Sequence, residues 1–167
     1  MVTIWGLRLA LHIGWRNQGK GEDYRYQQFR QDFGPERYWW FSYFQVFLLQ
    51  GGLLWFISAP VLAVPYLAAE ENPFGLFDAF ALLCWGVGFA FEAGGDWQLA
   101  QFKANPANKG KVLDQGFWKY TRHPNYFGDA AVWWGYGLLS VASGGYWPMI
   151  GPLLMTGLII QVSGVRL

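Results

Sequence analysis

Long uncharged stretches alternate with short polar stretches along this chain of 167 residues. Positions 38–69 and 130–165 contain no Asp, Glu, Lys or Arg, and positions 72–91 contain a single charged residue, Asp78. A helix needs only about 20 residues to cross the hydrocarbon core of a bilayer. The pattern therefore predicts an all-α, multi-pass transmembrane helical bundle rather than a soluble domain with buried helices.

Prolines and glycines divide the uncharged stretches into separate helices. Pro60 and Pro65 are expected to kink or end the first span, because proline interrupts helical hydrogen bonding. Gly144 and Gly145, followed by Pro148, predict a tight turn within the last stretch. We therefore expect a single membrane domain with about four full crossings and a partial N-terminal one, the full spans being 38–69, 72–91, 125–142 and 147–165.

Composition supports a membrane protein and excludes several other classes. Apolar residues make up 53% of the chain and charged residues 14%, whereas soluble domains contain roughly a quarter charged residues. The net charge of +1 gives no electrostatic basis for binding nucleic acid. Cys84 is the sole cysteine, which excludes an intramolecular disulfide and a zinc site made of cysteines. We expect it to be a small apolar packing residue.

Basic residues are concentrated in two polar stretches. Of the twelve Lys and Arg residues, five fall within 15–37 and five within 94–124, and the connecting turns at 68–74 and 142–147 contain none. By the positive-inside rule, both stretches and the end at Arg166 face the cytoplasm. The sequence therefore predicts an integral membrane protein with two cytoplasmic loops, 15–37 and 94–124.

The densest group of polar side chains surrounds the second of these loops. Glu92 and Asp96 are four residues apart, as are Asn125 and Asp129, so each pair would share one face of a helix. Lys103 lies two turns beyond Asp96 if that helix continues. Lysine and arginine pair with phosphates, whereas Asn and Asp bind ribose or amide groups. This combination suits a nucleotide whose anionic end lies at the cytoplasmic surface.

Other interpretations of these residues stay open. Carboxylates at membrane depth usually mark function, but Arg122 and Lys103 would equally neutralise them in a structural network. His123 is more simply a helix-initiating residue ahead of Pro124 than a metal ligand, because no second imidazole lies nearby in the sequence, and no metal is expected. The polar stretch 19–30 is either a solvated interfacial helix or a flap over the same site. Neither a Gly-x-Gly-x-x-Gly turn after a strand nor a Walker loop is present.

Three elements of the sequence resemble a known family. They are Gly-Glu-Asp-Tyr-Arg-Tyr at 21–26, the spaced set Glu92, Asp96, Gln98, Leu99 and Lys103, and Tyr-Thr-Arg-His-Pro-Asn-Tyr-Phe-Gly-Asp at 120–129. Together they resemble the steroid 5-alpha-reductase-like bacterial membrane proteins, whose superfamily includes sterol C14 reductases and isoprenylcysteine carboxyl methyltransferases. The Arg-His-Pro-Asn-Tyr element is shared across the superfamily, whereas Glu-Asp-Tyr-Arg-Tyr indicates the 5-alpha-reductase-like branch.

The resemblance implies a helical enzyme of the bacterial inner membrane that binds NADPH from the cytoplasmic side. Such an enzyme reduces an activated carbon–carbon double bond in a hydrophobic lipid or steroid-like substrate. Glu92 stands where the steroid enzymes have Asn, and Asp129 where many members have Glu. The cofactor-binding residues that the resemblance implies are Arg8, Glu92, Asp96, Lys103, Arg122, His123, Asn125, Tyr126 and Asp129.

The resemblance leaves the catalytic residues unknown. In the steroid reductases a glutamate on an earlier helix, and a tyrosine just before the position of Arg8, polarise the substrate carbonyl. This chain lacks the earlier helices, and Trp5 stands nearest to the place of that tyrosine. We therefore expect a member of the family that is truncated at both ends, with the cofactor half of the site present.

Three functions follow from these observations. An NADPH-dependent reductase is favoured by the cofactor motif. A non-catalytic structural subunit of a larger membrane complex, derived from such a reductase, is favoured by the missing helices. An S-adenosylmethionine-dependent isoprenylcysteine-type methyltransferase shares the Arg-His-Pro element, but the pair Asp96 and Lys103 argues against it. The expected partners are membrane lipids, a hydrophobic substrate and, in the second case, other membrane subunits.

Overall fold

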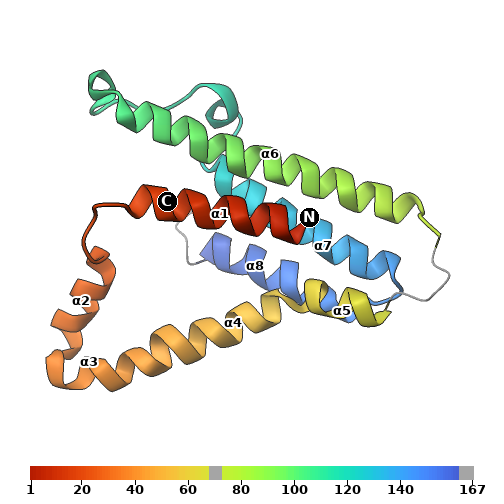
Figure 1. The fold of residues 1–167 in the computed structure, drawn as a ribbon, viewed down its shortest axis with the longest axis horizontal. Coiled ribbons are helices and arrows are strands. Elements are labelled where there is room, and N and C mark those ends of the chain that lie inside the picture. The colour runs from red at the N-terminus through yellow and green to blue at the C-terminus, as the bar shows by residue number, and fades with distance from the viewer. Residues whose placement is uncertain (68–72, 162–167) are drawn as a thin grey trace. The chain divides into compact units, whose positions relative to one another are not determined.

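The computed structural model describes residues 1–67 and 73–161, and every regular element in this part of the chain is a helix (Figure 1). The expected all-α class is therefore confirmed for the described residues. The chain divides into two compact units, Met1–Trp55 and the part from Phe56 onward, and each unit is described by itself. Glu70, Glu71 and Arg166, which entered the topology argument, lie outside the described residues.

The first unit contains two helices followed by a longer helical run. The helix α1 spans Val2–Asn17 and α2 spans Tyr24–Phe33. The run consists of α3 (Pro35–Ser42), the π-helical segment η1 (Tyr43–Leu49) and α4 (Gln50–Ile57), whose last two residues belong to the second unit. By length and composition this run could cross a membrane.

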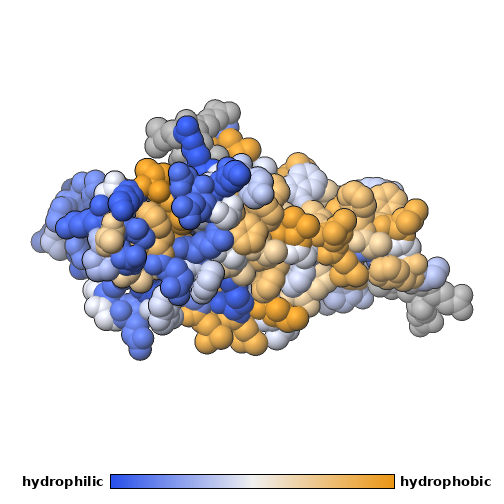
Figure 2. Space-filling view, turned by 90° about the horizontal axis from the view of Figure 1, so that it is seen from above, coloured by the Kyte–Doolittle hydropathy of each residue, from blue (hydrophilic) through white to orange (hydrophobic). Residues whose placement is uncertain are grey.

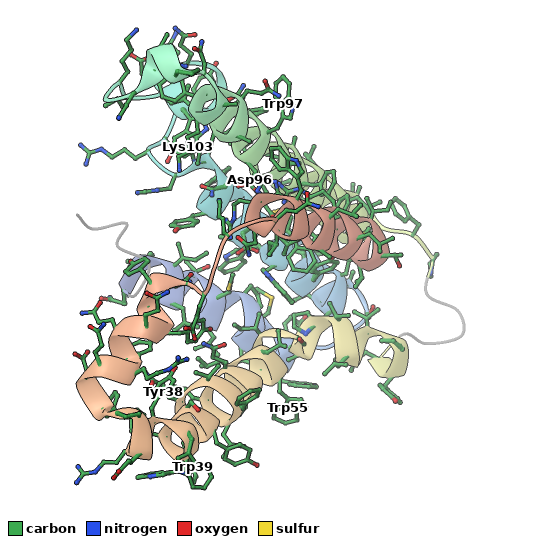
Figure 3. All side chains as sticks on the ribbon, turned by 60° about the vertical axis from the view of Figure 1, so that its left-hand side comes forward. Tyr38, Trp39, Trp55, Asp96, Trp97 and Lys103 are labelled. Atoms are coloured by element: carbon green, nitrogen blue, oxygen red, sulfur yellow. The ribbon has the colours of Figure 1, made fainter. Side chains whose placement is uncertain are left out.

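A sharp corner joins α2 to α3. Gly34 adopts a φ of +76°, a left-handed conformation that favours glycine. Phe33 and Phe41 stack across the corner with ring centroids 4.0 Å apart. The guanidinium of Arg30 lies 5.7 Å from the ring centre of Tyr38, which Figure 3 labels. Aromatic stacking and a cation–π contact thus fix the direction in which the long run leaves α2.

The second unit contains the remaining helices. The longest is α6 (Leu76–Ala104), which lies along α7 (Pro124–Ala142) in Figure 1. The helix α6 could also cross a membrane by length and composition. The other elements are α5 (Ala59–Leu67), the 3₁₀ turns η2 (Pro106–Asn108), η3 (Gly116–Lys119) and η4 (Trp147–Met149), and α8 (Ile150–Gln161).

Glycines allow α6 and α7 to touch backbone to backbone. A Cβ added to Gly88 of α6 would lie 2.6 Å from the backbone nitrogen of Val132 and 2.7 Å from the carbonyl oxygen of Gly128. A Cβ added to Gly128 would meet the backbone of Glu92 and Gly88. Small residues at a helix crossing maximise van der Waals packing where lipid removes the hydrophobic drive for association. Val132 is fully buried at this crossing.

The opposite side of α7 packs on η4 and α8, where a glycine of α7 lies against their side chains. A Cβ added to Gly137 would lie 2.8 Å from both Met149 and Pro152. The indole Nε1 of Trp134 donates a hydrogen bond of 3.0 Å to the hydroxyl of Thr156 on α8. The helix α7 is consequently the central element of the second unit, and it contains more buried residues than any other described helix of that unit.

Large apolar side chains are exposed in both units. Trp55 is 64% exposed, Phe80 66% and Leu153 57%. Figure 2 shows extensive orange, hydrophobic surface on the visible face, beside a blue, hydrophilic region. Apolar surface on this scale marks contact with membrane or with other proteins, in agreement with an integral membrane protein.

The structure changes the expected limits of the first two spans. The stretch 38–69 is divided, because the helical run ends at Ile57 and α5 begins at Ala59. Pro60 accounts for this break, since proline is accepted in the first turn of a helix and disrupts its interior. Pro65 nevertheless lies inside α5. Residues 68 and 69 lie outside the described part of the chain.

The helix expected to end at position 91 continues to Ala104. Positions 94–104, expected at the start of a cytoplasmic loop, are therefore helical, and the loop begins at Asn105. Glu92 ends the apolar run but not the helix, because glutamate is a good helix former, and here it is buried against α7 with 4% of its surface exposed. No proline occurs in α6, so the next break comes just before Pro106. Much of the other expected loop, 15–37, is helical as well.

Helices occupy the later two expected spans with similar limits where they are described, and that these helices cross the membrane stays a prediction. The helix α7 occupies Pro124–Ala142, and η4 and α8 occupy positions 147–161 of the expected span 147–165. By length and composition, two helical runs among the described residues could cross a membrane. The expected total of four full crossings stays a prediction.

The first test concerns the α6–α7 crossing. We expect Gly88→Ala to lower the free energy of unfolding by about 1–3 kcal/mol, because the new methyl group meets backbone atoms that cannot move aside. Gly86→Ala is the matched control on the same helix, since no described atom that could obstruct its Cβ lies within 4 Å. Thermal or chemical unfolding in detergent measures both variants. Equal stability of the two would contradict the packing described here.

The start of α2 gives a second test. Asp23 is the N-cap, and its carboxylate accepts hydrogen bonds from the backbone nitrogen and the guanidinium of Arg25. The side-chain bond from Arg25 is the main cause that lowers the pKa of Asp23 from 3.8 to about 2. The cap therefore stabilises α2 above pH 3.8, and this contribution is lost as the pH falls through about 2. Carboxyl-carbon NMR should give the lowered midpoint, and Arg25→Ala should return it towards 3.8.

Candidate functional site

Two of the predicted site residues meet directly where α7 begins. The side-chain amide of Asn125 donates a hydrogen bond of 3.2 Å to the carboxylate of Asp96 on α6, and the contact is partly buried. Gly95 makes this approach possible, because a Cβ there would lie 3.1 Å from Pro124 and 3.2 Å from the backbone nitrogen of Asn125. The amide oxygen of Asn125 is buried and has no hydrogen-bond partner among the described residues. A buried acceptor without a partner is costly, so a donor group that reached it would stabilise this contact.

Two further carboxylates lie near the same contact. Glu92 is one turn before Asp96 on α6, and its backbone lies against Gly128 of α7. Asp129 follows Gly128 directly and is half-buried. The helix crossing thus places Glu92 beside Gly128 and Asp96 beside Asn125, on successive turns of α6. Buried charge of this kind is costly and is usually kept for function.

The residues just before this crossing form a compact turn. The rings of His123 and Tyr126 stack with centroids 5.1 Å apart and an interplanar angle of 15°. The backbone nitrogen of His123 donates to the hydroxyl of Thr121 at 3.3 Å. Arg122, between them, is exposed. His123 therefore has the expected place as the residue that precedes α7, with its ring held by Tyr126.

The loop between α6 and α7 folds back onto α6. Trp118 donates from Nε1 to the carbonyl oxygen of Gly95 at 3.0 Å, and the backbone nitrogen of Phe117 donates to the amide oxygen of Gln98 at 3.0 Å. Asn108 donates to the carbonyl oxygen of Phe102 at 3.0 Å. The first two of these hydrogen bonds join residues 23 and 19 positions apart, and they hold the loop beside the Asp96–Asn125 contact.

A groove of about 450 Å³ opens between this loop and the end of α6. Three of the residues that line it are lysines, Lys103, Lys109 and Lys111. Leu99, Phe102 and Trp118 are among its apolar residues. Figure 3 shows Asp96, Trp97 and Lys103 on the same helix, so α6 connects the carboxylate contact with the groove. A shallower depression of about 390 Å³ shares part of the loop and is lined largely by amide side chains.

Comparison with known protein families gives a match over the whole of this chain. A family model described as "Protein of unknown function (DUF1295)" matches residues 1–167. The chain belongs to the DUF1295 family.

Curated relatives of this DUF1295 protein include two fungal sterol reductases. It is 32% identical over 98 residues to the Delta(14)-sterol reductase erg24 of Schizosaccharomyces pombe, a match that covers 50% of this chain and 23% of the relative. It is 33% identical over 105 residues to the Delta(14)-sterol reductase of Ascobolus immersus, covering 54% and 24% respectively. The chain thus spans about a quarter of the length of these relatives. No solved structure matches. These findings are consistent with the steroid 5-alpha-reductase-like superfamily.

The structure of the DUF1295 protein brings together many of the predicted site residues. Asp96 and Asn125 are in contact, His123 and Tyr126 form a stacked pair, and Lys103 lines the groove. Arg8 lies on α1 in the first unit, and its part in the site stays a prediction. The cofactor-binding role of all nine residues stays a prediction as well.

The prediction from sequence missed several residues that shape the site. Gln98 entered only through the family resemblance, and the anchoring role of Trp118 was not foreseen. Lys109 and Lys111 were counted as loop charge without a place in the site. Lys109 and Lys111 lie in a loop, so no helical period in the sequence indicates that they line the same groove as Lys103. The remaining signal was the density of lysines in one short loop.

The anchoring bond of Gln98 gives a third test. We expect Gln98→Leu to lower the free energy of unfolding by about 1 kcal/mol, because the backbone nitrogen of Phe117 loses its acceptor in a partly buried place. Gln101→Leu, on the same helix and exposed, serves as the control. Hydrogen exchange at the Phe117 amide should accelerate in the first variant alone. Unchanged protection there would contradict the anchoring role.

Proposed function

We propose that this chain is a membrane-embedded, NADPH-dependent reductase of an activated carbon–carbon double bond in a lipid or steroid-like substrate. The observation that supports it best is the contact between Asp96 and Asn125, with the unpartnered amide oxygen of Asn125 beside it. Similarity to two sterol reductases supports the reaction class. Because the chain spans about a quarter of those relatives, the activity of a whole enzyme is part of the proposal.

The residues at the crossing fit the polar, uncharged parts of a dinucleotide. Asp96 would accept hydrogen bonds from ribose hydroxyl groups or a carboxamide, and the oxygen of Asn125 would accept another. Asp96 and Asn125 already bond each other, so a ligand would meet side chains that are held in place before it binds. Such preorganisation reduces the ordering cost of binding.

The remaining groups have supporting parts in this proposal. Exposed Arg122 and the groove lysine Lys103 would neutralise phosphate charge. When bound, the nicotinamide would supply a hydride to one carbon of the activated double bond. The stacked rings of His123 and Tyr126 would border the same region. The acid that delivers the proton is not assigned to a residue.

The proposal includes a place for the hydrophobic substrate and an orientation in the membrane. A lipid or steroid-like substrate would arrive from the bilayer along the exposed apolar side chains. The basic loop after α6 would face the cytoplasm of a bacterium, where NADPH is present, in keeping with the positive-inside rule. The site would then lie where a cytoplasmic cofactor and a membrane-dissolved substrate can meet.

Cofactor binding by the purified chain is the fourth test. In detergent or nanodiscs we expect saturable NADPH binding, seen as quenching of tryptophan fluorescence or by calorimetry. Asp96→Ala and Asn125→Ala should each weaken it about tenfold or more, because a buried partner loses its hydrogen bond. Asp32→Ala removes an exposed carboxylate on α2 and should leave affinity unchanged. Melting curves would establish that all variants are folded.

Two outcomes would overturn the proposal in different ways. Absence of NADPH binding by the unsubstituted chain would refute the reductase function, and binding of S-adenosylmethionine in its place would favour methyl transfer. Full affinity in both Asp96→Ala and Asn125→Ala would leave the cofactor in place but refute the assignment of its site.

A further inference from the structure

The groove beside α6 combines positive charge with apolar walls. Lys103, Lys109 and Lys111 line it, and no described residue that lines it is acidic. Among the described residues, none of the three ammonium groups takes part in an ion pair. Three like charges gathered without a counter-charge repel one another, and an anionic ligand would relieve that repulsion. The groove is therefore suited to a polyanion such as one that contains phosphate groups.

The two loop lysines are held in position by the backbone. The amide of Lys109 donates to the carbonyl oxygen of Pro106 at 3.2 Å, and the amide of Lys111 donates to that of Asn108 at 3.0 Å. Gly110 between them adopts a φ of +79°, which strongly favours glycine. This folded turn directs both lysines to the groove that Lys103 also lines. The charge cluster is thus a product of defined loop geometry.

The groove adjoins the Asp96–Asn125 contact. Lys103 lies seven residues, or about 10 Å, beyond Asp96 along α6. Trp118 lines the groove and also bonds the carbonyl oxygen of Gly95, the residue next to Asp96. One extended ligand could therefore reach both places, with its neutral end at the helix crossing and its phosphate groups among the lysines.

The walls of the groove also fit an adenine ring. Trp118 and Phe102 present aromatic surface, and Leu99 and Leu113 add aliphatic surface. Aromatic side chains stack on nucleobases, and such a contact is typically worth about 1–3 kcal/mol per base. A free phosphate or a lipid headgroup would use the lysines but not the aromatic wall. This difference favours a nucleotide over either.

We propose, on the basis of the proposed function, that this groove binds the adenosine end of the dinucleotide and that Lys109 and Lys111 select NADPH over NADH. Both dinucleotides contain the pyrophosphate, but NADPH alone has an additional phosphate on the adenosine 2′ oxygen. Lys103, nearest to Asp96 along the helix, serves the pyrophosphate. The two loop lysines bind the 2′-phosphate, whose monoester contributes up to two further negative charges.

The test compares both dinucleotides on the full chain in detergent. The unsubstituted protein should bind NADPH about tenfold or more tightly than NADH, and the same preference should appear for 2′,5′-ADP over AMP. The double variant Lys109→Gln/Lys111→Gln should lose most of this preference, with NADPH affinity falling and NADH affinity changing about twofold or less. Lys20→Gln, an exposed lysine of the first unit, is the control and should keep the preference.

The failure of this inference differs from failure of the proposed function. Equal affinity for NADPH and NADH, or a preference that survives the double substitution, would overturn the selection by Lys109 and Lys111 while leaving a dinucleotide site intact. If the chain bound neither NADPH nor NADH, both this inference and the proposed function would be refuted. Melting temperatures test a lipid as the alternative ligand. A short-chain phosphatidylglycerol, and not 2′,5′-ADP, would then stabilise the unsubstituted chain but not the double variant. In that case the lysines would bind a lipid headgroup, and the inference would be wrong.

Discussion

The close approach of α6 and α7 is the interaction on which the second unit depends. Gly88 and Gly128 remove the side chains that would separate the two backbones, so that the helices meet at van der Waals distance. In a bilayer, helices gain little from hiding apolar surface, and close packing of small residues replaces that drive. The same approach encloses Glu92, whose carboxylate would be very costly in open hydrocarbon. Packing and polar chemistry are therefore located at one crossing.

The α6–α7 crossing fixes the position of the first turn of α7, and the candidate site forms there. Pro124 begins the helix against Gly95, and the next residue, Asn125, then reaches Asp96. A side chain at Gly95 would push the two apart. Because α6 continues past the crossing, it also supplies Lys103 and a surface on which the loop folds back. Two helices and one loop thus give a polar contact between a carboxylate and an amide, and a cationic groove that adjoins it along α6.

The similarity to sterol reductases concerns about a quarter of each relative. The polar cluster offers hydrogen-bond acceptors and the lysine groove offers positive charge, both of which the proposed cofactor would use. Substrate recognition in a membrane also needs apolar surface, which this chain presents in both units. The proposed function thus divides the second unit: its polar residues would hold a nucleotide, and its apolar surface would meet the bilayer. This division is physically consistent, since charged cofactors and lipids enter from different phases.

The sequence by itself determined the helical class, the position of α7 and the residue types of the site. Run length, proline and glycine placement and the Arg-His-Pro-Asn-Tyr element are local signals, and the limits of α7 agree with them. Only the tertiary structure showed that α6 extends to Ala104, since the charge of Glu92 ends an apolar run and says nothing of where the helix ends, and packing on α7 and on the returning loop supports the helix beyond it. Only the tertiary structure brought Lys109 and Lys111 to the groove, since the loop is held by bonds such as Trp118 to Gly95, which lie 23 residues apart. Contacts between such distant residues leave no periodic trace in a sequence.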